Sequence, residues 1–241
     1  MGGIKLMGNF EAITCKNCGR QIMDLNFFAN TQTVCNNCAK KNNRIDKVVG
    51  KLQKQKFLEE RRVHIDDRLA ANKLKKLINK SLSELYNNSY SQLIILCIGT
   101  DRSTGDALGP LVGSRLNRII APQIPVFGTL ENPVHATNLE KNREFIAQEY
   151  FKPFILAIDA GLGKNKSVGS ISVNHGALKP GSGVNKNLSP IGNMHITGLV
   201  NIGGYMEYFV LQSTRLSLVV KMAKLISRGI SWGLRSKGFL N

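Results

Sequence analysis

Two apolar runs of strand length constrain the fold of this chain more than any other feature of its sequence. Residues Leu93 to Ile98 are all apolar, and so are most residues from Pro153 to Ala160. A strand that is apolar on both faces is typical of a parallel sheet covered by helices on both sides. The other expected elements are helices at residues 66–87, 106–120, 139–150 and 204–229 and strands at 125–130, 168–174 and 195–201. We therefore predict an α/β fold, a three-layer α/β/α sandwich around a mostly parallel sheet.

Four of the five cysteines lie in the first 38 residues, in two Cys-x-x-Cys pairs. Cys15 and Cys18 form the first pair, and Cys35 and Cys38 follow after sixteen intervening residues. In a reducing compartment this spacing favours a structural zinc site over a disulfide framework. Each pair offers two thiolates from one tight turn, and two such turns complete a tetrahedron around Zn²⁺. The alternative is two adjacent redox dithiols. Cys97, inside an apolar strand, is expected to be a small buried hydrophobic residue.

These patterns divide the chain into three segments. Residues 1–42 are predicted to form a zinc ribbon, residues 43–62 a basic helical connector, and residues 63–241 the α/β domain. The net charge is +17, and residues 39–80 alone carry a surplus of nine positive charges. Such a field favours an acidic protein substrate or nucleic acid as a partner of the connector. A solvated helical surface is the alternative interpretation.

The sequence does not predict a membrane segment. The longest apolar candidate, residues 216–232, is interrupted by Lys221, Lys224 and Arg228, and a membrane-spanning helix needs about 20 predominantly apolar residues. The first residues also lack the positively charged lead and apolar run of a secretory signal. We therefore expect a cytoplasmic protein.

Two carboxylates follow the apolar strands. Asp106 lies in the glycine-rich loop after the first run, and Asp159 closes the second. Functional residues in open parallel sheets gather at the carboxyl ends of the strands, and a half-buried acid is costly unless it is paired, hydrogen-bonded or used. The alternatives are that Asp106 caps the following helix and that Asp159 belongs to an ordinary turn.

Two facing acids can share acid–base work, because the charge of one raises the pKa of the other. They can also hold a second divalent metal together with a third group, for which His175 is the candidate. The loop glycines follow a strand and precede a helix, as in phosphate-binding loops. However, the loop has neither a G-x-G-x-x-G pattern nor a Gly-Lys-Ser/Thr ending, so nucleotide binding is a weak alternative.

Several motifs resemble a known family. The segments from Cys97 to Gly113 and from Gly128 to Leu139 resemble the YyaC family of sporulation proteins, described as spore proteases. More widely, Asp106-Ala-Leu-Gly-Pro110, Ala157-Ile-Asp-Ala160 and Pro180-Gly-Ser-Gly-Val184 are similar to motifs of the germination protease of bacterial spores. The resemblance covers about residues 62–241, whereas the zinc ribbon and the connector are not part of that pattern.

The resemblance implies that Asp106 and Asp159 are the catalytic acids of a fold like that of the hydrogenase-maturation proteases. Those enzymes hold nickel between two acids and a histidine, and His175 lies about where that histidine falls. The implied substrates are the small acid-soluble proteins that coat spore DNA, in the forespore or spore core. Two loops are expected to contact the substrate and to offer backbone amides to the oxyanion, through Thr100, Asp101, Gly181, Ser182 and Gly183.

Three functions remain open from the sequence. The first is an aspartate-dependent endopeptidase acting in sporulation or germination. The second is a catalytically inactive module that docks on a protein or on DNA through its zinc ribbon and basic helix. The third is metal-assisted chemistry at Asp106, Asp159 and His175.

Overall fold

The computed structural model describes residues 13–22, 34, 37, 38, 40, 41, 59–181, 188–204 and 206–240. The chain divides into two compact units, Met1–Glu59 and Glu60–Asn241. Most of the predicted connector, residues 43–58, lies outside the described residues. No helix in the described part of the chain is long and apolar enough to cross a membrane.

In the first unit, residues 13–22 form a small hairpin. Strand β1 (Ile13–Thr14) pairs antiparallel with β2 (Gln21–Ile22). The backbone N–H of Cys15 donates to the carbonyl of Arg20 at 2.8 Å, and that of Gly19 donates to the carbonyl of Cys15 at 2.9 Å. Gly19 takes a positive φ of 68°, which closes the turn at little steric cost because glycine has no Cβ. The hairpin therefore holds the first Cys-x-x-Cys pair in one tight turn.

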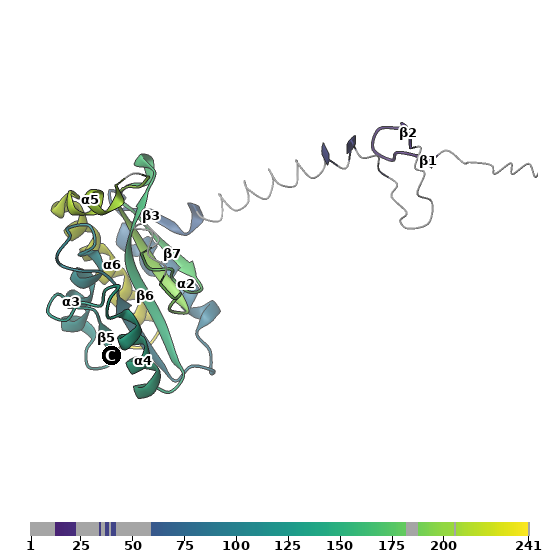
Figure 1. The fold of residues 1–241 in the computed structure, drawn as a ribbon. Coiled ribbons are helices and arrows are strands. Elements are labelled where there is room, and N and C mark those ends of the chain that lie inside the picture. Colours follow the sequence, from purple (N-terminus) through teal and green to yellow (C-terminus); the bar gives the residue numbers. More distant parts are fainter. Residues whose placement is uncertain are drawn as a thin grey trace, which may run out of the picture. The chain divides into compact units, whose positions relative to one another are not determined.

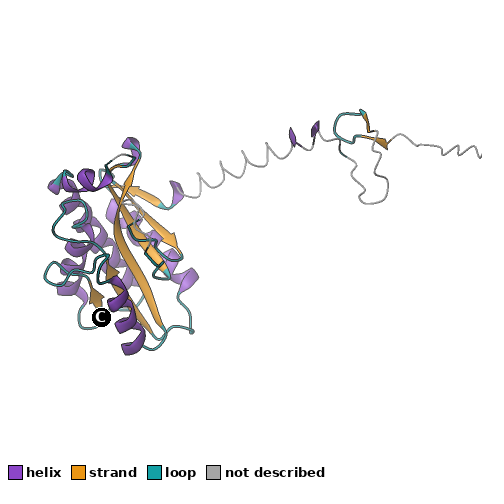
Figure 2. Cartoon of the chain, viewed as in Figure 1, coloured by secondary structure: helices purple, strands orange, loops and turns teal. Residues whose placement is uncertain are grey.

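The second unit is a six-stranded mixed sheet with helices on both faces (Figures 1 and 2). The strands lie in the order β3-β7-β8-β6-β4-β5. Their bounds are β3 Arg62–His64, β4 Gln92–Cys97, β5 Val126–Phe127, β6 Pro153–Gly163, β7 Ser170–His175 and β8 Met194–Ile202. The pairs β8–β6, β6–β4 and β4–β5 are parallel, and the pairs β3–β7 and β7–β8 are antiparallel. The helices are α2 Ala70–Leu85, α3 Leu108–Ile120, α4 Leu139–Glu149, α5 Glu207–Gln212 and α6 Leu216–Ser236, with a 3₁₀ turn η1 at Asn165–Ser167.

Side chains along the central strands point alternately to the two faces of the sheet, and this produces the three layers. In β4, Leu93, Ile95 and Cys97 belong to the core under α2, α3 and α6, whereas Ile94 and Leu96 belong to a second core under α4. Successive side chains of a strand point to opposite faces, so a run of apolar residues supplies both cores. The predicted three-layer α/β/α sandwich is confirmed, as is the burial of Cys97, which raises the pKa of its thiol.

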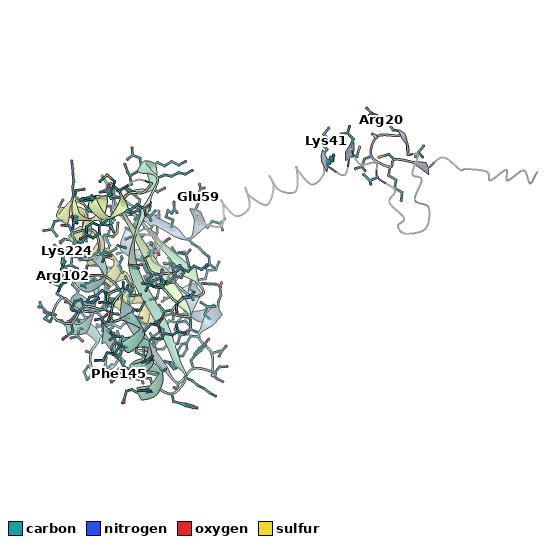
Figure 3. All side chains as sticks on the ribbon, in the orientation of Figure 1. Arg20, Lys41, Glu59, Arg102, Phe145 and Lys224 are labelled. Atoms are coloured by element: carbon teal, nitrogen blue, oxygen red, sulfur yellow. The ribbon has the colours of Figure 1, made fainter. Side chains whose placement is uncertain are left out.

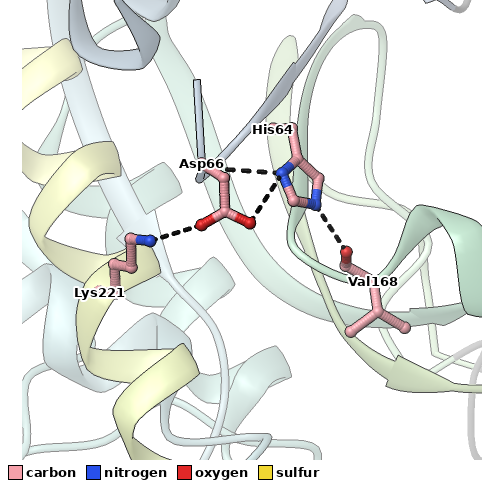
Figure 4. A network of polar contacts seen from close by, with 4 residues as sticks. All are labelled: His64, Asp66, Val168 and Lys221. Atoms are coloured by element: carbon pink, nitrogen blue, oxygen red, sulfur yellow. Dashed lines mark hydrogen bonds and ion pairs between the residues drawn. The ribbon is translucent and has the colours of Figure 1, made fainter. Parts of the chain in front are cut away.

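The edge strand β3, which the sequence patterns did not indicate, is held in place by polar contacts (Figure 4). His64 Nε2 lies 3.0 Å from the carbonyl oxygen of Val168, and the Asp66 carboxylate lies 3.4 Å from His64 Nδ1. Lys221 of α6 donates to the same carboxylate at 2.6 Å. These contacts connect the end of β3 with the start of β7 and with α6.

Several expected boundaries were wrong. The strand expected at 125–130 is reduced to the two residues of β5, and β6 continues past Asp159 to Gly163. The helical stretch expected from 204 is two helices, α5 and α6, separated at residues 213–215. There the hydroxyl of Thr214 donates to the carbonyl of Val210 at 2.8 Å, which turns the chain after α5.

Candidate active site

Asp106 lies in the loop between β4 and α3, and close backbone packing fixes that loop. Gly99 has a φ of +145°, and a Cβ at this position would lie 2.0 Å from the carbonyl oxygen of Asp106. A Cβ at Gly109 would lie 2.0 Å from the carbonyl oxygen of Ile98. The glycines of this loop therefore allow its backbone to pass next to the end of β4, which explains their presence without a bound phosphate. Asp106 itself is half-buried.

Asp159 lies within β6, one residue beyond Ile158, which pairs with Cys97 at the end of β4. On the other side of β6, Asp159 pairs with Thr197 of β8. Only 7% of the residue is exposed. Burial, and next the charge of Asp106, raise the pKa of the Asp159 carboxyl well above its ordinary value, although a hydrogen bond with the backbone of Ala160 opposes the shift.

The two acids meet because of the strand order. From β4 the chain passes through α3 to β5 on one side, and then returns through α4 to β6 on the other side of β4. In open α/β sheets, the crevice at the carboxyl ends of the strands where this direction reverses is the usual binding site. Asp106 follows β4 and Asp159 lies near the end of β6, so both acids lie at this crevice.

A cavity of about 300 Å³ contains both carboxylates. It brings together segments that lie far apart in the sequence: the loop before α3, the second half of β6, the middle of β8, the loop after β7, and α5. Its lining residues are Asp106, Asp159, Ala160, Gly161, Leu162, Leu178, Lys179, Gly181, Thr197, Leu199, Glu207 and Leu211. The acids thus share a concave site with four leucines and one lysine.

Sequence reasoning missed Glu207 and Lys179. Glu207 is the first residue of α5, and its Oε1 accepts a hydrogen bond from the backbone N–H of Gly204 at 3.2 Å. An acid at the start of a helix is normally explained by the helix dipole, so its sequence context gave no sign of a role in the cavity. Lys179 directly precedes the Pro-Gly-Ser-Gly motif. That position was the only sequence feature that could have indicated its place in the cavity.

The predicted loop residues have different positions. Gly181 lines the cavity, whereas Ser182 and Gly183 lie outside the described residues. Thr100 and Asp101 are not part of the cavity lining, and the Thr100 hydroxyl instead lies 3.4 Å from the Asp101 carboxylate. Of the five predicted loop residues, the structure therefore places Gly181 at the cavity, among those that it describes.

His175 is not close to the acid pair. It pairs with Met194 at the start of β8, three residues along the strand from Thr197, which faces Asp159. Its Nε2 lies 3.1 Å from the Ser81 hydroxyl and 3.4 Å from the Glu84 carboxylate, both on α2. Burial, and next the charge of Arg61, lower the pKa of the His175 imidazole. The expected role of His175 as third group of the acid pair is therefore corrected: its contacts are structural.

A metal at the acid pair does not fit the residues present. Within the described part of the chain, no third acid, histidine or cysteine has a ligand atom close enough to those of Asp106 and Asp159 to complete a site. Glu207 lines the same cavity but does not form a ligand group with the two aspartates.

The cysteine cluster does fit a metal. The Sγ atoms of Cys15, Cys18 and Cys38 all lie within 4.8 Å of one another. Thiolates that share a tetrahedral Zn²⁺ at about 2.3 Å lie about 3.8 Å apart, so the three sulfurs match such an ion. Cys35, the expected fourth ligand, lies outside the described residues.

Comparisons with known proteins agree with the motifs. The sequence model of a family described as "Protein of unknown function (DUF1256)" matches residues 62–229. A Bacillus subtilis (strain 168) protein described as "Uncharacterized protein YyaC" is 46% identical over 165 residues, which are 68% of this chain and 79% of that protein. The resemblance to the YyaC proteins is confirmed. Among solved structures, a [NiFe] hydrogenase maturation protease, HycI from Thermococcus kodakarensis KOD1, is 17% identical with a TM-score of 0.43, and the match covers 64% of this chain and 98% of that one.

Proposed function

The chain belongs to the DUF1256 family, and we propose that it is an endopeptidase in which Asp106 and Asp159 hydrolyse peptide bonds. The observation that carries this proposal is the pairing of two acids in different environments within one cavity. Asp159 is buried and its pKa is raised, whereas Asp106 is half-buried on a loop. Two carboxyl groups whose environments separate their pKa values are suited to opposite roles in proton transfer.

The different burial of the two acids suggests which one acts as general base and which one as general acid. Asp106, as a carboxylate, removes a proton from a water molecule, whose oxygen then forms a bond with the carbonyl carbon of the substrate. Asp159, as a neutral acid, donates its proton to the carbonyl oxygen, giving a neutral tetrahedral diol. When the C–N bond breaks, the proton held by Asp106 passes to the leaving nitrogen, and a diol hydroxyl returns a proton to Asp159. Both acids then regain their starting states.

The cavity can also bind a peptide. Its apolar side chains, Leu162, Leu178, Leu199 and Leu211, offer contacts for substrate side chains, and Lys179 offers a positive charge. On the exposed side of α5, next to the cavity residues Glu207 and Leu211, Tyr208 and Phe209 are 61% and 57% exposed. Exposed aromatic residues beside a cavity are typical of interaction surfaces.

We further propose that the substrates are small acid-soluble spore proteins and that the protein acts in the cytoplasm of the forespore or in the spore core. The three motifs that resemble the germination protease, around Asp106, Asp159 and Gly181, support this class of substrate. In the N-terminal unit, we propose that Cys35 joins the three clustered cysteines and that the ion is Zn²⁺, which would supply the folding free energy that so small a unit lacks.

Cleavage of a purified small acid-soluble spore protein by the full chain tests the proposal. Asp106→Asn and Asp159→Asn are expected to lower kcat/KM by a factor of about 100 or more, since each removes one partner of the proton transfer. Glu149→Gln, the same kind of change at an exposed acid of α4, serves as the matched control. Cleavage that persists in both aspartate variants, or that Glu149→Gln abolishes equally, would contradict the proposal.

A chelator separates this mechanism from metal-assisted chemistry. The aspartate pair needs no metal, so cleavage is expected to continue after treatment with a chelator too weak to remove metal from the cysteine cluster. Loss of cleavage that is restored by adding a divalent metal would contradict the metal-free mechanism and support metal-assisted hydrolysis.

A further inference from the structure

A second cavity lies between α3 and α6, away from the acid pair. Its volume is about 260 Å³, and its lining residues are Arg115, Ile119, Ser227, Arg228, Ser231, Trp232 and Arg235. Arg115 lies seven residues after the start of α3, or about 10 Å along the helix axis at 1.5 Å per residue. None of these residues lines the cavity around Asp106 and Asp159.

Helical spacing gathers positive charge on one stripe of α6. Lys224, Arg228, Trp232 and Arg235 are separated by three or four residues, so they lie on the same face of the helix. All four are exposed, and Figure 3 labels Lys224. Neither α3 nor α6 contains an acidic residue. Among the described residues, no ion pair involves Arg115, Arg228 or Arg235. The three guanidinium groups therefore form a positive site whose charge the described acids do not neutralise through ion pairs.

Contacts within the cavity also hold some of its charged side chains in place. Nε of Arg115 donates to the hydroxyl of Ser227 at 3.2 Å, and Ser227 is only 1% exposed. The guanidinium of Arg228 lies over the ring of Trp232, 5.6 Å from its centroid. Trp232 and Ile119 are nevertheless 41% and 44% exposed. The cavity thus combines two positioned guanidinium groups, those of Arg115 and Arg228, with an indole ring whose exposed part can contact a planar ligand.

We propose that this α3–α6 groove binds single-stranded nucleic acid. Guanidinium groups recognise phosphate oxygens through paired hydrogen bonds, and a base can stack on an exposed aromatic ring whatever its sequence. A stretch of Asp and Glu side chains would satisfy the arginines but has no aromatic ring to stack on Trp232, whereas every nucleotide supplies one, so the indole favours nucleic acid. The net charge of +17 adds long-range attraction for a phosphate backbone.

The chain contains a single tryptophan, so its fluorescence reports on this groove alone. Titration of the full chain with a short oligothymidylate is expected to quench Trp232 in a saturable manner. The double variant Arg115→Gln/Arg235→Gln is expected to weaken binding about tenfold and to reduce the slope of log K against log salt by about 1.4, since a single-strand phosphate contact contributes about 0.7. Arg235→Gln alone should also weaken binding, by less than the double variant. Because this change removes no hydrogen bond or ion pair that α3 or α6 makes among the described residues, it separates a loss of binding from a loss of structure.

Arg68→Gln/Arg143→Gln is the matched control, because it removes two exposed positive charges from the same unit but from outside the groove. It is expected to change the affinity less than twofold. Three results would overturn the proposal: oligothymidylate that binds without quenching Trp232, equal weakening by both double variants, or equal quenching by an oligoglutamate. Thymidine monophosphate that binds as tightly as the oligonucleotide would show a mononucleotide site, and so would also overturn binding of a strand.

Discussion

Burial of Asp159 has a thermodynamic consequence that can be measured without any substrate. Its folded-state pKa is raised by burial and by the charge of Asp106, whereas the carboxyl of an unfolded aspartate titrates near pH 3.9. Between these two values the unfolded chain has released the proton and the folded chain has kept it. Stability is therefore fully present below the unfolded pKa and is lost as the pH rises towards the folded pKa.

The slope of this loss is fixed by the one proton involved. Each pH unit in the window lowers the free energy of unfolding by about 1.4 kcal/mol. Asp159→Asn removes the titration, so the variant should gain up to about 1.4 kcal/mol on the wild type for each pH unit above about pH 4. For a domain of this size that is roughly 3 to 6 °C in Tm per pH unit.

Urea unfolding of the full chain at pH 4, 5, 6 and 7 measures the effect. The difference in stability between Asp159→Asn and wild type should grow with pH from about pH 4 and level off once the pH passes the folded pKa of Asp159. In Asp106→Asn the neighbouring charge is gone, so the folded pKa of Asp159 should fall and the pH dependence should end at a lower pH. A difference between Asp159→Asn and wild type that is constant from pH 4 upwards would refute the raised pKa of Asp159.

Three further predictions concern other parts of the chain. The lowered pKa of His175 means that stability is lost as the pH falls below the unfolded value of about 6.5, so His175→Gln should flatten the acid side of a Tm–pH profile. Gly99→Ala should cost about 2 kcal/mol or more in urea unfolding, because its Cβ would meet the Asp106 carbonyl oxygen, whereas Gly176→Ala, with positive φ but open space, should cost about 1 kcal/mol. Cys38→Ser should abolish the binding of one zinc per chain in metal analysis, whereas Cys97→Ala should retain it.

The central strands could be predicted because their sequence pattern and their burial have the same cause. Strands β4 and β6 lie between other strands and are covered on both faces, so nearly every position must be apolar. The edge strands gave weaker signals. β3 contains Arg62, Val63 and His64, of which only Val63 is buried, and three residues with one buried position have no detectable period.

The candidate site was predictable only in part, for a related reason. Asp106 and Asp159 stood out because each comes after a run of apolar residues, where an acid has no role in the core. Glu207 and Lys179 come from a short helix and a loop whose positions depend on tertiary contacts. His175 was misplaced because the antiparallel direction of β7 reverses its polarity: the carboxyl end of β7 lies beside Met194, the first residue of β8. The sequence pattern of a single strand carries no information on its direction.

The strand order explains why acids so far apart in sequence form one site. Asp106 and Asp159 are separated by a helix, a strand, a second helix and the first half of β6, yet β4 and β6 are parallel neighbours. The carboxyl ends of two adjacent parallel strands necessarily lie at the same edge of the sheet. Because β4 ends at Cys97 while β6 continues to Gly163, Asp159 stays buried within a strand while Asp106 lies on a loop. The offset between two neighbouring strands thus buries one of two chemically identical side chains, and this burial raises the pKa of Asp159.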